Sequence, residues 1–327
     1  MYYKSNMIIK SLEQGRNVID TDWKLKKWEG RDKLTCFELE DTRLQEPLSR
    51  IVYGATPDFY RMDDPLHMLS LKSQLEEAWL CASKNVAGLP ECIDSFFFHN
   101  TDGNIPEDLR KTMPFCVYHY SDTALVHLWK DANIGAIQAY LKRVSYSVAF
   151  TMRALHDHGI AVRQVLPENL RLQRTTRTFI LAEFFSLCRF GKHGNQFDPH
   201  KGHLVLEKQY CAPECFSTDI LTPATDVFAL GILLLRLMGA EITEPIQNER
   251  QVIEHLVAIE KKRKVKLSTD LIRTLKFALL SDPKKRTQTP DEFLTLLTGR
   301  EIKKRPFQKH HSQKNKKSNY TTSRRSF

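Results

Sequence analysis

Side chains able to do chemistry gather in one stretch of the chain and recur a short distance beyond it. Arg163, Gln164, Glu168 and Asn169 lie within seven positions, and Glu183 follows fourteen residues after Asn169. A carboxamide and a carboxylate supply oxygen ligands of the kind that hard divalent cations accept. Asn169 and Glu183 could therefore hold one metal ion and, with it, the phosphates of a nucleotide.

Other groups with metal-binding side chains do not form a recognisable site. The chain has seven cysteines and no CxxC pair, and the pair Cys211 and Cys215 lacks a second pair of ligands nearby. His193, His200 and His203 share a segment but have no carboxylate or thiolate companions at a fixed spacing. We therefore predict no metal at these residues, and free thiols without disulfides in a reducing compartment.

Two kinds of segment must position the chemical side chains. Residues 35–118 contain short mixed apolar runs between turn-forming residues, which predicts a small antiparallel sheet with one helix that opens at Pro65. Residues 121–299 carry apolar side chains at helical spacing, which predicts a mainly helical lobe. The expected class is α+β with two lobes and a hinge at 118–121. Residues 1–34 are an N-terminal extension without an assigned structure.

The motifs of the second lobe occur in the order and at the intervals of protein kinases, which the chain resembles. Their matching residues are Arg163, Pro167, Glu168 and Asn169 of the catalytic loop, Phe184 of the DFG position, Pro213 and Glu214 of the APE motif, Asp226 and Gly231 of the central helix, and Arg286 of the last motif. The resemblance implies the two-lobed kinase fold. It also implies that Asp226 accepts hydrogen bonds from the catalytic loop and that Glu214 pairs with Arg286.

The resemblance further implies that the catalytic groups have changed. The general base of active relatives is replaced by Gln164, whose amide accepts no proton at neutral pH. Leu166 stands at the lysine that steadies the transferred phosphate, and Val162 at the preceding histidine. Glu183 lengthens the metal-binding carboxylate of DFG, and Phe185 replaces its glycine. We therefore predict a pseudokinase, which is not an enzyme.

The first lobe offers little for nucleotide binding. It contains no G-x-G-x-x-G loop to bring backbone N–H groups over phosphates. Arg61 best matches the lysine of the third strand and could pair with Glu76. Together with Asn169 and Glu183, these residues are the candidate nucleotide-binding set. We expect weak ATP binding, no Mg²⁺ and no required cofactor.

The net charge of +10 is concentrated at the C-terminal end. Residues 300–327 hold ten Lys and Arg against one Glu, so the rest of the chain is nearly neutral. Few apolar residues and many like charges predict a disordered tail. Its two basic clusters resemble a nuclear-import signal or could bind nucleic acid or another acidic partner, and a solubilising terminus is the alternative. They are Lys303, Lys304 and Arg305, and Lys314, Lys316 and Lys317.

The function predicted from these observations is a protein-binding scaffold or allosteric regulator whose partner is another protein, such as an active kinase. An atypical kinase or nucleotidyl or phosphoryl transferase with residual nucleotide binding is one alternative. A nucleic-acid-associated protein that uses the basic tail is another. No apolar run approaches the roughly 20 residues of a membrane span. We expect an intracellular protein of the nucleus or cytoplasm.

Overall fold

The computed structural model describes most of the second half of the chain and separate segments of the first half. The described residues are 7–11, 23–31, 34–41, 51–57, 81, 84, 86–89, 92–100, 113–119, 123–124, 134–173, 177–182, 186–191, 206–217 and 220–300.

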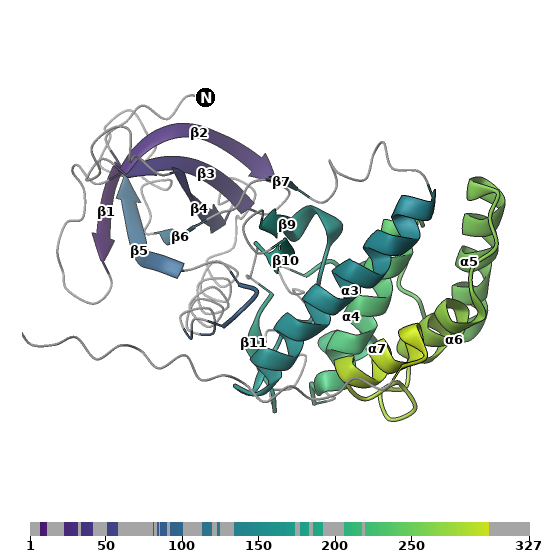
Figure 1. Ribbon diagram of the computed structural model, residues 1–327. Helices are drawn as coiled ribbons and strands as arrows, with labels where there is room; N and C mark the ends of the chain where they lie inside the picture. Colours follow the sequence, from purple (N-terminus) through teal and green to yellow (C-terminus); the bar gives the residue numbers. More distant parts are fainter. Residues whose placement is uncertain are drawn as a thin grey trace, which may run out of the picture.

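The first lobe is built on a six-stranded antiparallel sheet with the strand order β1-β5-β6-β4-β3-β2. Its strands are β1 (Met7–Ser11), β2 (Trp23–Arg31), β3 (Leu34–Asp41), β4 (Ile51–Pro57), β5 (Cys92–Asn100) and β6 (Met113–His119). Aromatic and β-branched residues in CIDSFFFHN and IVYGATP favour extended backbone. Strands β1 and β2 lie in the stretch that had no assigned structure, and they form the two edges of this sheet (Figure 1).

The helix expected to open at Pro65 lies outside the described residues except at Cys81, which is helical and buried. Of the expected hinge, Tyr118 belongs to β6, which ends at His119, and positions 120–122 lie outside the described residues. The segment at 86–89 contacts the second lobe through a backbone hydrogen bond, in which the Leu181 N–H donates to the Gly88 carbonyl at 2.8 Å.

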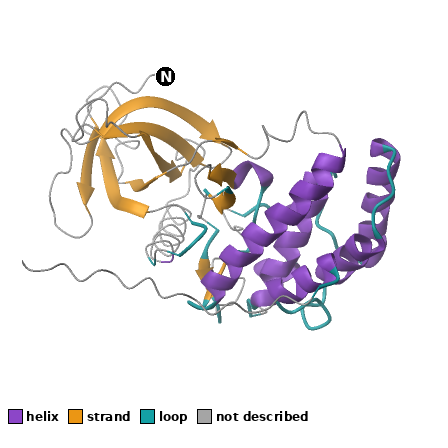
Figure 2. Cartoon of the chain, viewed as in Figure 1, coloured by secondary structure: helices purple, strands orange, loops and turns teal. Residues whose placement is uncertain are grey.

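The second lobe is mainly helical, as the apolar spacing predicts (Figure 2). Its helices are α3 (Ile134–His156), α4 (Pro223–Leu237), α5 (Glu249–Arg263), α6 (Thr269–Ala278) and α7 (Pro290–Thr298). Two small antiparallel sheets lie beside α3 and carry the loops of the site. They are formed by β7 (Thr123–Ala124), β9 (Leu170–Gln173) and β10 (Thr178–Leu181), and by β8 (Ile160–Ala161) and β11 (Cys188–Arg189).

Helix α4 is the central element of the second lobe and is buried on almost every side. Its sequence PATDVFALGILLLRL leaves only Pro223 and Arg236 partly exposed, and it packs against α3, α6 and α7. At Gly231 the approach is so close that an added Cβ would lie 2.9 Å from Cδ2 of Leu279. The helix is fixed on all sides, so it can position the polar residue at its start, Asp226.

The described part of the chain contains no helix that is both long and apolar enough to cross a membrane. Its four cysteines with described side chains are all free thiols and all buried. They are Cys81, Cys188, Cys211 and Cys215.

Candidate functional site

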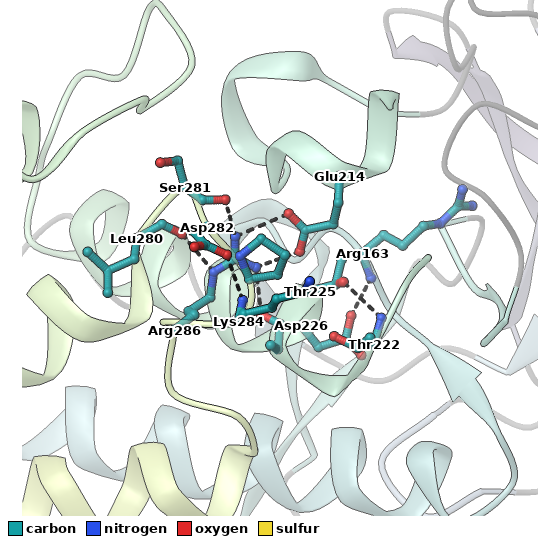
Figure 3. Close-up of polar contacts among 12 residues, drawn as sticks. Arg163, Glu214, Thr222, Thr225, Asp226, Leu280, Ser281, Asp282, Lys284 and Arg286 are labelled. Atoms are coloured by element: carbon teal, nitrogen blue, oxygen red, sulfur yellow. Dashed lines mark hydrogen bonds and ion pairs between the residues drawn. The ribbon is translucent and has the colours of Figure 1, made fainter. Parts of the chain in front are cut away.

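The loop between β8 and the 3₁₀ helix η3 (Pro167–Asn169) is anchored by the fully buried carboxylate of Asp226. Its Oδ2 accepts the Val162 N–H at 2.8 Å, and its Oδ1 accepts the Arg163 N–H at 2.7 Å. His156, from the last turn of α3, places Nε2 2.7 Å from Oδ2. One carboxylate thus joins α3, α4 and the loop, and Figure 3 shows its contact with Arg163.

Arg163 adopts a left-handed backbone conformation, with φ +67°, which is unfavourable for a residue with a Cβ. The contact with Asp226 holds its N–H in place, and its Nε donates to the Ser186 carbonyl at 2.7 Å. Its side chain is almost fully buried. The guanidinium therefore connects the loop to the segment that follows the DFG position, and the surrounding contacts offset the backbone strain.

Gln164, which the resemblance places at the position of the general base, forms a structural link through its side chain. Its Oε1 accepts the Glu207 N–H at 2.7 Å and the Cys211 thiol at 3.1 Å. Its carbonyl accepts the Ser186 hydroxyl at 3.2 Å. Among the described residues, nothing accepts a hydrogen bond from its Nε2. We call the stretch from the DFG position at Glu183 to Glu214 of the APE motif the activation segment. The amide group of Gln164 therefore fixes the end of this segment.

Asn169 ends η3 beside the strand that leads to the DFG position. Its carbonyl accepts the Ala182 N–H at 2.7 Å, which brings the backbone one residue before Glu183 against the loop. Within the described part of the chain, its half-buried carboxamide has no hydrogen-bond partner. Leu166, at the lysine position, is buried and supplies no charge. The uncommitted polar side chain at this point is therefore that of Asn169.

Glu168 forms a paired contact with Arg236 on α4. The two guanidinium nitrogens of Arg236 lie 2.9 and 2.8 Å from the two carboxylate oxygens. Arg236 also covers the ring of Tyr210 at 4.5 Å from its centroid. Fork-shaped pairs of this kind fix geometry as well as charge. The pair neutralises Glu168 and attaches the loop to the end of the activation segment.

Glu214 and Arg286 form an ion pair with almost no solvent exposure (Figure 3). Nη1 lies 2.5 Å from Oε1, and Nη2 lies 3.1 Å from Oε2. The remaining guanidinium donors reach carbonyls, because Nε donates to Leu280 at 2.8 Å and Nη1 donates to Ala224 at 2.9 Å. The charge is therefore both paired and fully hydrogen-bonded, as a buried ion requires.

Several residues singled out from the sequence lie outside the described residues. They are Arg61, Glu76, Glu183, Phe184, Phe185, Lys303, Lys304, Arg305, Lys314, Lys316 and Lys317, and the three histidines 193, 200 and 203. Within the described part, no group of three or more His, Cys, Asp or Glu residues is arranged to hold a metal ion.

Three contacts of the site were missed by reasoning from the sequence. His156 could have been noticed as a polar residue at the end of an apolar-faced helix, just before the loop. Arg236 interrupts the otherwise apolar run of α4, which was a signal for a partner. The contact between Cys211 and Gln164 had no signal, because the two residues are 47 positions apart.

A comparison with family models matches the protein kinase domain over residues 110–314, more than half of the chain. The chain belongs to the protein kinase domain family. Serine/threonine-protein kinase N2 of Danio rerio is 27% identical over 160 residues, which are 49% of this chain and 15% of that protein. Cyclin-dependent kinase 7 of Caenorhabditis elegans is 28% identical over 144 residues, 44% of this chain and 41% of that one. The chain thus spans less than half the length of these relatives.

Among solved structures, the kinase domain shares its fold with that of PknI from Mycobacterium tuberculosis, crystallised as a double mutant. The TM-score is 0.58 and the identity 16%, over 85% of this chain and 95% of the other. The predicted family and the predicted two-lobed fold are therefore confirmed.

The prediction that this protein kinase domain is not an enzyme is wrong. It is contradicted by the family match and by relatives that are named as kinases. The prediction rested on changed residue types at the positions of the catalytic groups and on the absence of a glycine-rich loop. Phosphoryl transfer proceeds through a loose transition state, so positioning and charge stabilisation contribute most of the rate enhancement. Residue types at single positions are therefore a weak basis for predicting the absence of the reaction.

Proposed function

We propose that the chain is an atypical protein kinase that transfers the γ-phosphoryl group of ATP to a hydroxyl group of a protein. The observation that carries the proposal is the carboxamide of Asn169. It lies at the end of an anchored loop, has no partner among the described residues, and sits beside the backbone that leads to Glu183. Family membership supports the same reaction class.

The donor set of Asn169 and Glu183 fits a hard divalent cation, because both side chains offer oxygen ligands. When bound, such a cation would neutralise charge on the phosphates of ATP. Asn169 would orient that group from a fixed position, since its backbone is tied to Ala182. Leu166 supplies no positive charge at the phosphate, which favours weak nucleotide binding.

Gln164 would orient the attacking hydroxyl as a donor. Its Oε1 is engaged by Glu207 and Cys211, so Nε2 is the group that remains for a ligand. The N–H₂ group would donate to the hydroxyl oxygen, and the hydroxyl proton would pass to solvent or to an oxygen of the transferred phosphoryl group. General-base assistance is typically worth about 10²- to 10⁴-fold. We therefore expect transfer to be slow compared with relatives that keep the base.

The test measures incorporation of radiolabel from [γ-³²P]ATP into the purified full chain and into a pool of Ser-, Thr- and Tyr-containing peptides, with Mg²⁺ or Mn²⁺. Asn169→Ala should lower the rate by about tenfold or more, because transition-state positioning is lost. The matched control is Gln247→Ala, which removes an exposed carboxamide far from the loop. Equal incorporation by the wild type and Asn169→Ala would identify a contaminating kinase and overturn the proposal.

A second candidate role is regulation of another protein through binding. The observation that favours it is the link from Gln164 to Glu207 and Cys211, which gives the end of the activation segment a fixed form. A fixed segment of this kind suits a scaffold or allosteric partner, including one for an active kinase. Co-purification with such a kinase, and a change in its rate on adding the chain, would test this role.

Association with nucleic acid through the tail, and residence in the nucleus or cytoplasm, stay proposals. The tail lies outside the described residues, and its charge is the support for polyanion binding. Removing residues 300–327 should abolish the salt-dependent part of any such binding, measured by fluorescence anisotropy with a single-stranded oligonucleotide.

A further inference from the structure

Helix α5 presents two aliphatic side chains to solvent. Ile253 is 41% exposed and Val257 is 57% exposed, one helical turn apart. The opposite side of the helix is buried through Val252, Leu256 and Ile259. Among helices α5 packs mainly on α6, and Figure 1 shows it at the outer edge of the second lobe, away from the six-stranded sheet.

A basic cluster continues the same line of the helix. Ile253, Val257 and Lys261 recur every four positions, so they lie along one face of α5. Lys264 follows directly after the helix, where it forms the C-cap in a left-handed backbone conformation. We call the basic end of α5 and the residues after it, Lys261–Lys266, the lysine end. It holds five basic side chains, of which Arg263 is half-buried and the other four are exposed.

Most of this positive charge is not neutralised within the described part of the chain. Lys262 reaches the exposed Glu241 at 2.9 Å, and Arg263 lies against the backbone at Gly239, where its buried Nε has no hydrogen-bond partner. Lys261, Lys264 and Lys266 have no ion-pair partner among the described residues. Glu260, the nearest other acid, accepts the Leu267 N–H. The lysine end therefore keeps a net positive charge that can attract an acidic ligand.

We propose that this face of α5 is a docking surface for an acidic amphipathic segment of another protein. Ile253 and Val257 contact two apolar side chains of the segment, and the lysine end contacts Asp and Glu side chains that follow them. Charge complementarity sets the direction in which the segment lies. The role does not depend on phosphoryl transfer, because the loop of Gln164 and Asn169 takes no part in it.

Other occupants fit less well. The chain's own tail is strongly basic, so the lysine end repels it. A second copy offers the same basic lysine end, and its remaining folded part is nearly neutral, so it lacks the acidic charge that would match. Nucleic acid would match the charge, but bases bind through stacking on aromatic side chains, and α5 contains no Phe, Tyr or Trp. Two exposed aliphatic residues beside the charge therefore favour a protein segment.

The test uses the full chain and a fluorescein-labelled helical peptide with Leu at two positions one turn apart, followed by four Glu residues. Fluorescence anisotropy gives its Kd. Ile253→Ser with Val257→Ser should weaken binding at least about tenfold, and Lys261→Glu with Lys264→Glu should do the same while reducing the dependence on salt. A peptide with Ser in place of Leu should bind the wild type as weakly as the apolar double variant binds the original peptide.

The matched control changes another exposed apolar pair one turn apart, Tyr146→Ser with Phe150→Ser on α3, and should leave the Kd unchanged. The apolar side chains are partly buried, so thermal unfolding is measured for every variant, and binding is compared at a temperature at which all of them are folded. No binding of the Leu/Glu peptide, or equal binding by wild type and both α5 variants, overturns the proposal. The proposal is also overturned, in favour of a nucleic-acid surface, if only the charge variant loses peptide binding and single-stranded DNA fully displaces the peptide from the wild type.

Discussion

Glu214 and Arg286 are 72 positions apart in the sequence, yet they meet in a two-bond ion pair from which solvent is excluded. The glutamate belongs to the 3₁₀ helix η5 (Pro213–Phe216), and the arginine precedes α7. The ring of Phe228 on α4 lies beneath the guanidinium, with its centroid 4.9 Å from Cζ. The pair therefore connects the end of the activation segment to the last helices of the lobe.

We expect either single replacement, Glu214→Ala or Arg286→Ala, to lower the free energy of unfolding by about 3–5 kcal/mol, because the partner charge stays buried. Replacing both with Leu and Met should destabilise less than either single change. Urea unfolding followed by circular dichroism measures this. The control breaks the exposed ion pair of Arg250 and Glu254, which should lower the free energy of unfolding by at most about 0.5 kcal/mol. Neutral single variants would contradict the assigned role.

Gly231→Ala should destabilise the lobe although alanine favours helices. The added methyl group meets Leu279, which is fully buried and has little freedom to move. Overpacking typically costs about 1–3 kcal/mol, more than the gain of about 1 kcal/mol in helix propensity. Adding Leu279→Ala should recover stability relative to Leu279→Ala alone. If Gly231→Ala raised the melting temperature in the wild-type background, α4 and α6 would not approach as described.

Gln164→Ala should loosen the end of the activation segment. It removes the acceptor of the Glu207 N–H and the Cys211 thiol, and loss of a buried partner costs about 1–3 kcal/mol. Amide hydrogen exchange at Glu207 should become faster. Gln164→Met, which keeps the volume without the acceptor, should behave like Gln164→Ala, because the loss is one of hydrogen bonding. Unchanged exchange in both variants would rule out the link.

His255 should make the chain less stable in mild acid. Burial lowers its pKa below the ordinary value of 6.5, and Glu254 opposes this in part. The unfolded state binds the proton more readily than the folded state. The contribution of His255 to folding stability is therefore complete above pH 6.5 and is lost as the pH falls through the folded-state pKa. His255→Gln should therefore show a smaller drop in Tm between about pH 7.5 and pH 5 than the wild type. An equal drop would exclude His255 as a cause.

Cys215 should react slowly with iodoacetamide in the native state. A hydrogen bond with Cys211, followed by burial, raises the pKa of its thiol well above the ordinary value of 9.0. The thiolate is the nucleophile, so alkylation should increase only at higher pH. Since the folded pKa is raised, this group's contribution to stability is lost as pH rises above 9.0. Peptide mapping by mass spectrometry reports the site, and rapid labelling at neutral pH would contradict the burial.

The fold of the second lobe could be predicted because the residues that identify it are polar side chains that form buried hydrogen bonds and ion pairs. Asp226, Glu214 and Arg286 stand at intervals that few folds reproduce, and α4 shows a continuous apolar run. The first lobe offered less, because β2 contains three lysines and β1 owes its pairing to a distant partner, as Met7 does to Asn100. Local patterns do not reveal such pairs.

The site was predictable only in its residue types. The resemblance places Gln164 at the position of the base, whereas its bonds to Glu207 and Cys211 depend on how the activation segment returns to the loop. The wrong prediction about enzymatic activity has the same cause, because the sequence does not show how side chains are arranged in space. The sequence shows which group is missing, whereas the rate depends on how the remaining groups are positioned.

The carboxylate of Asp226 also bears on the order in which the molecule assembles. Its hydrogen bonds to Val162 and Arg163 close a chain segment of more than sixty residues, and loop closure of that length carries an entropic penalty. The left-handed turn at Arg163 has no local reason to form before α4 is in place. The loop between β8 and η3 should therefore become ordered late in folding and be released early in unfolding. Faster amide hydrogen exchange at Val162 and Arg163 on heating would then precede loss of helical signal.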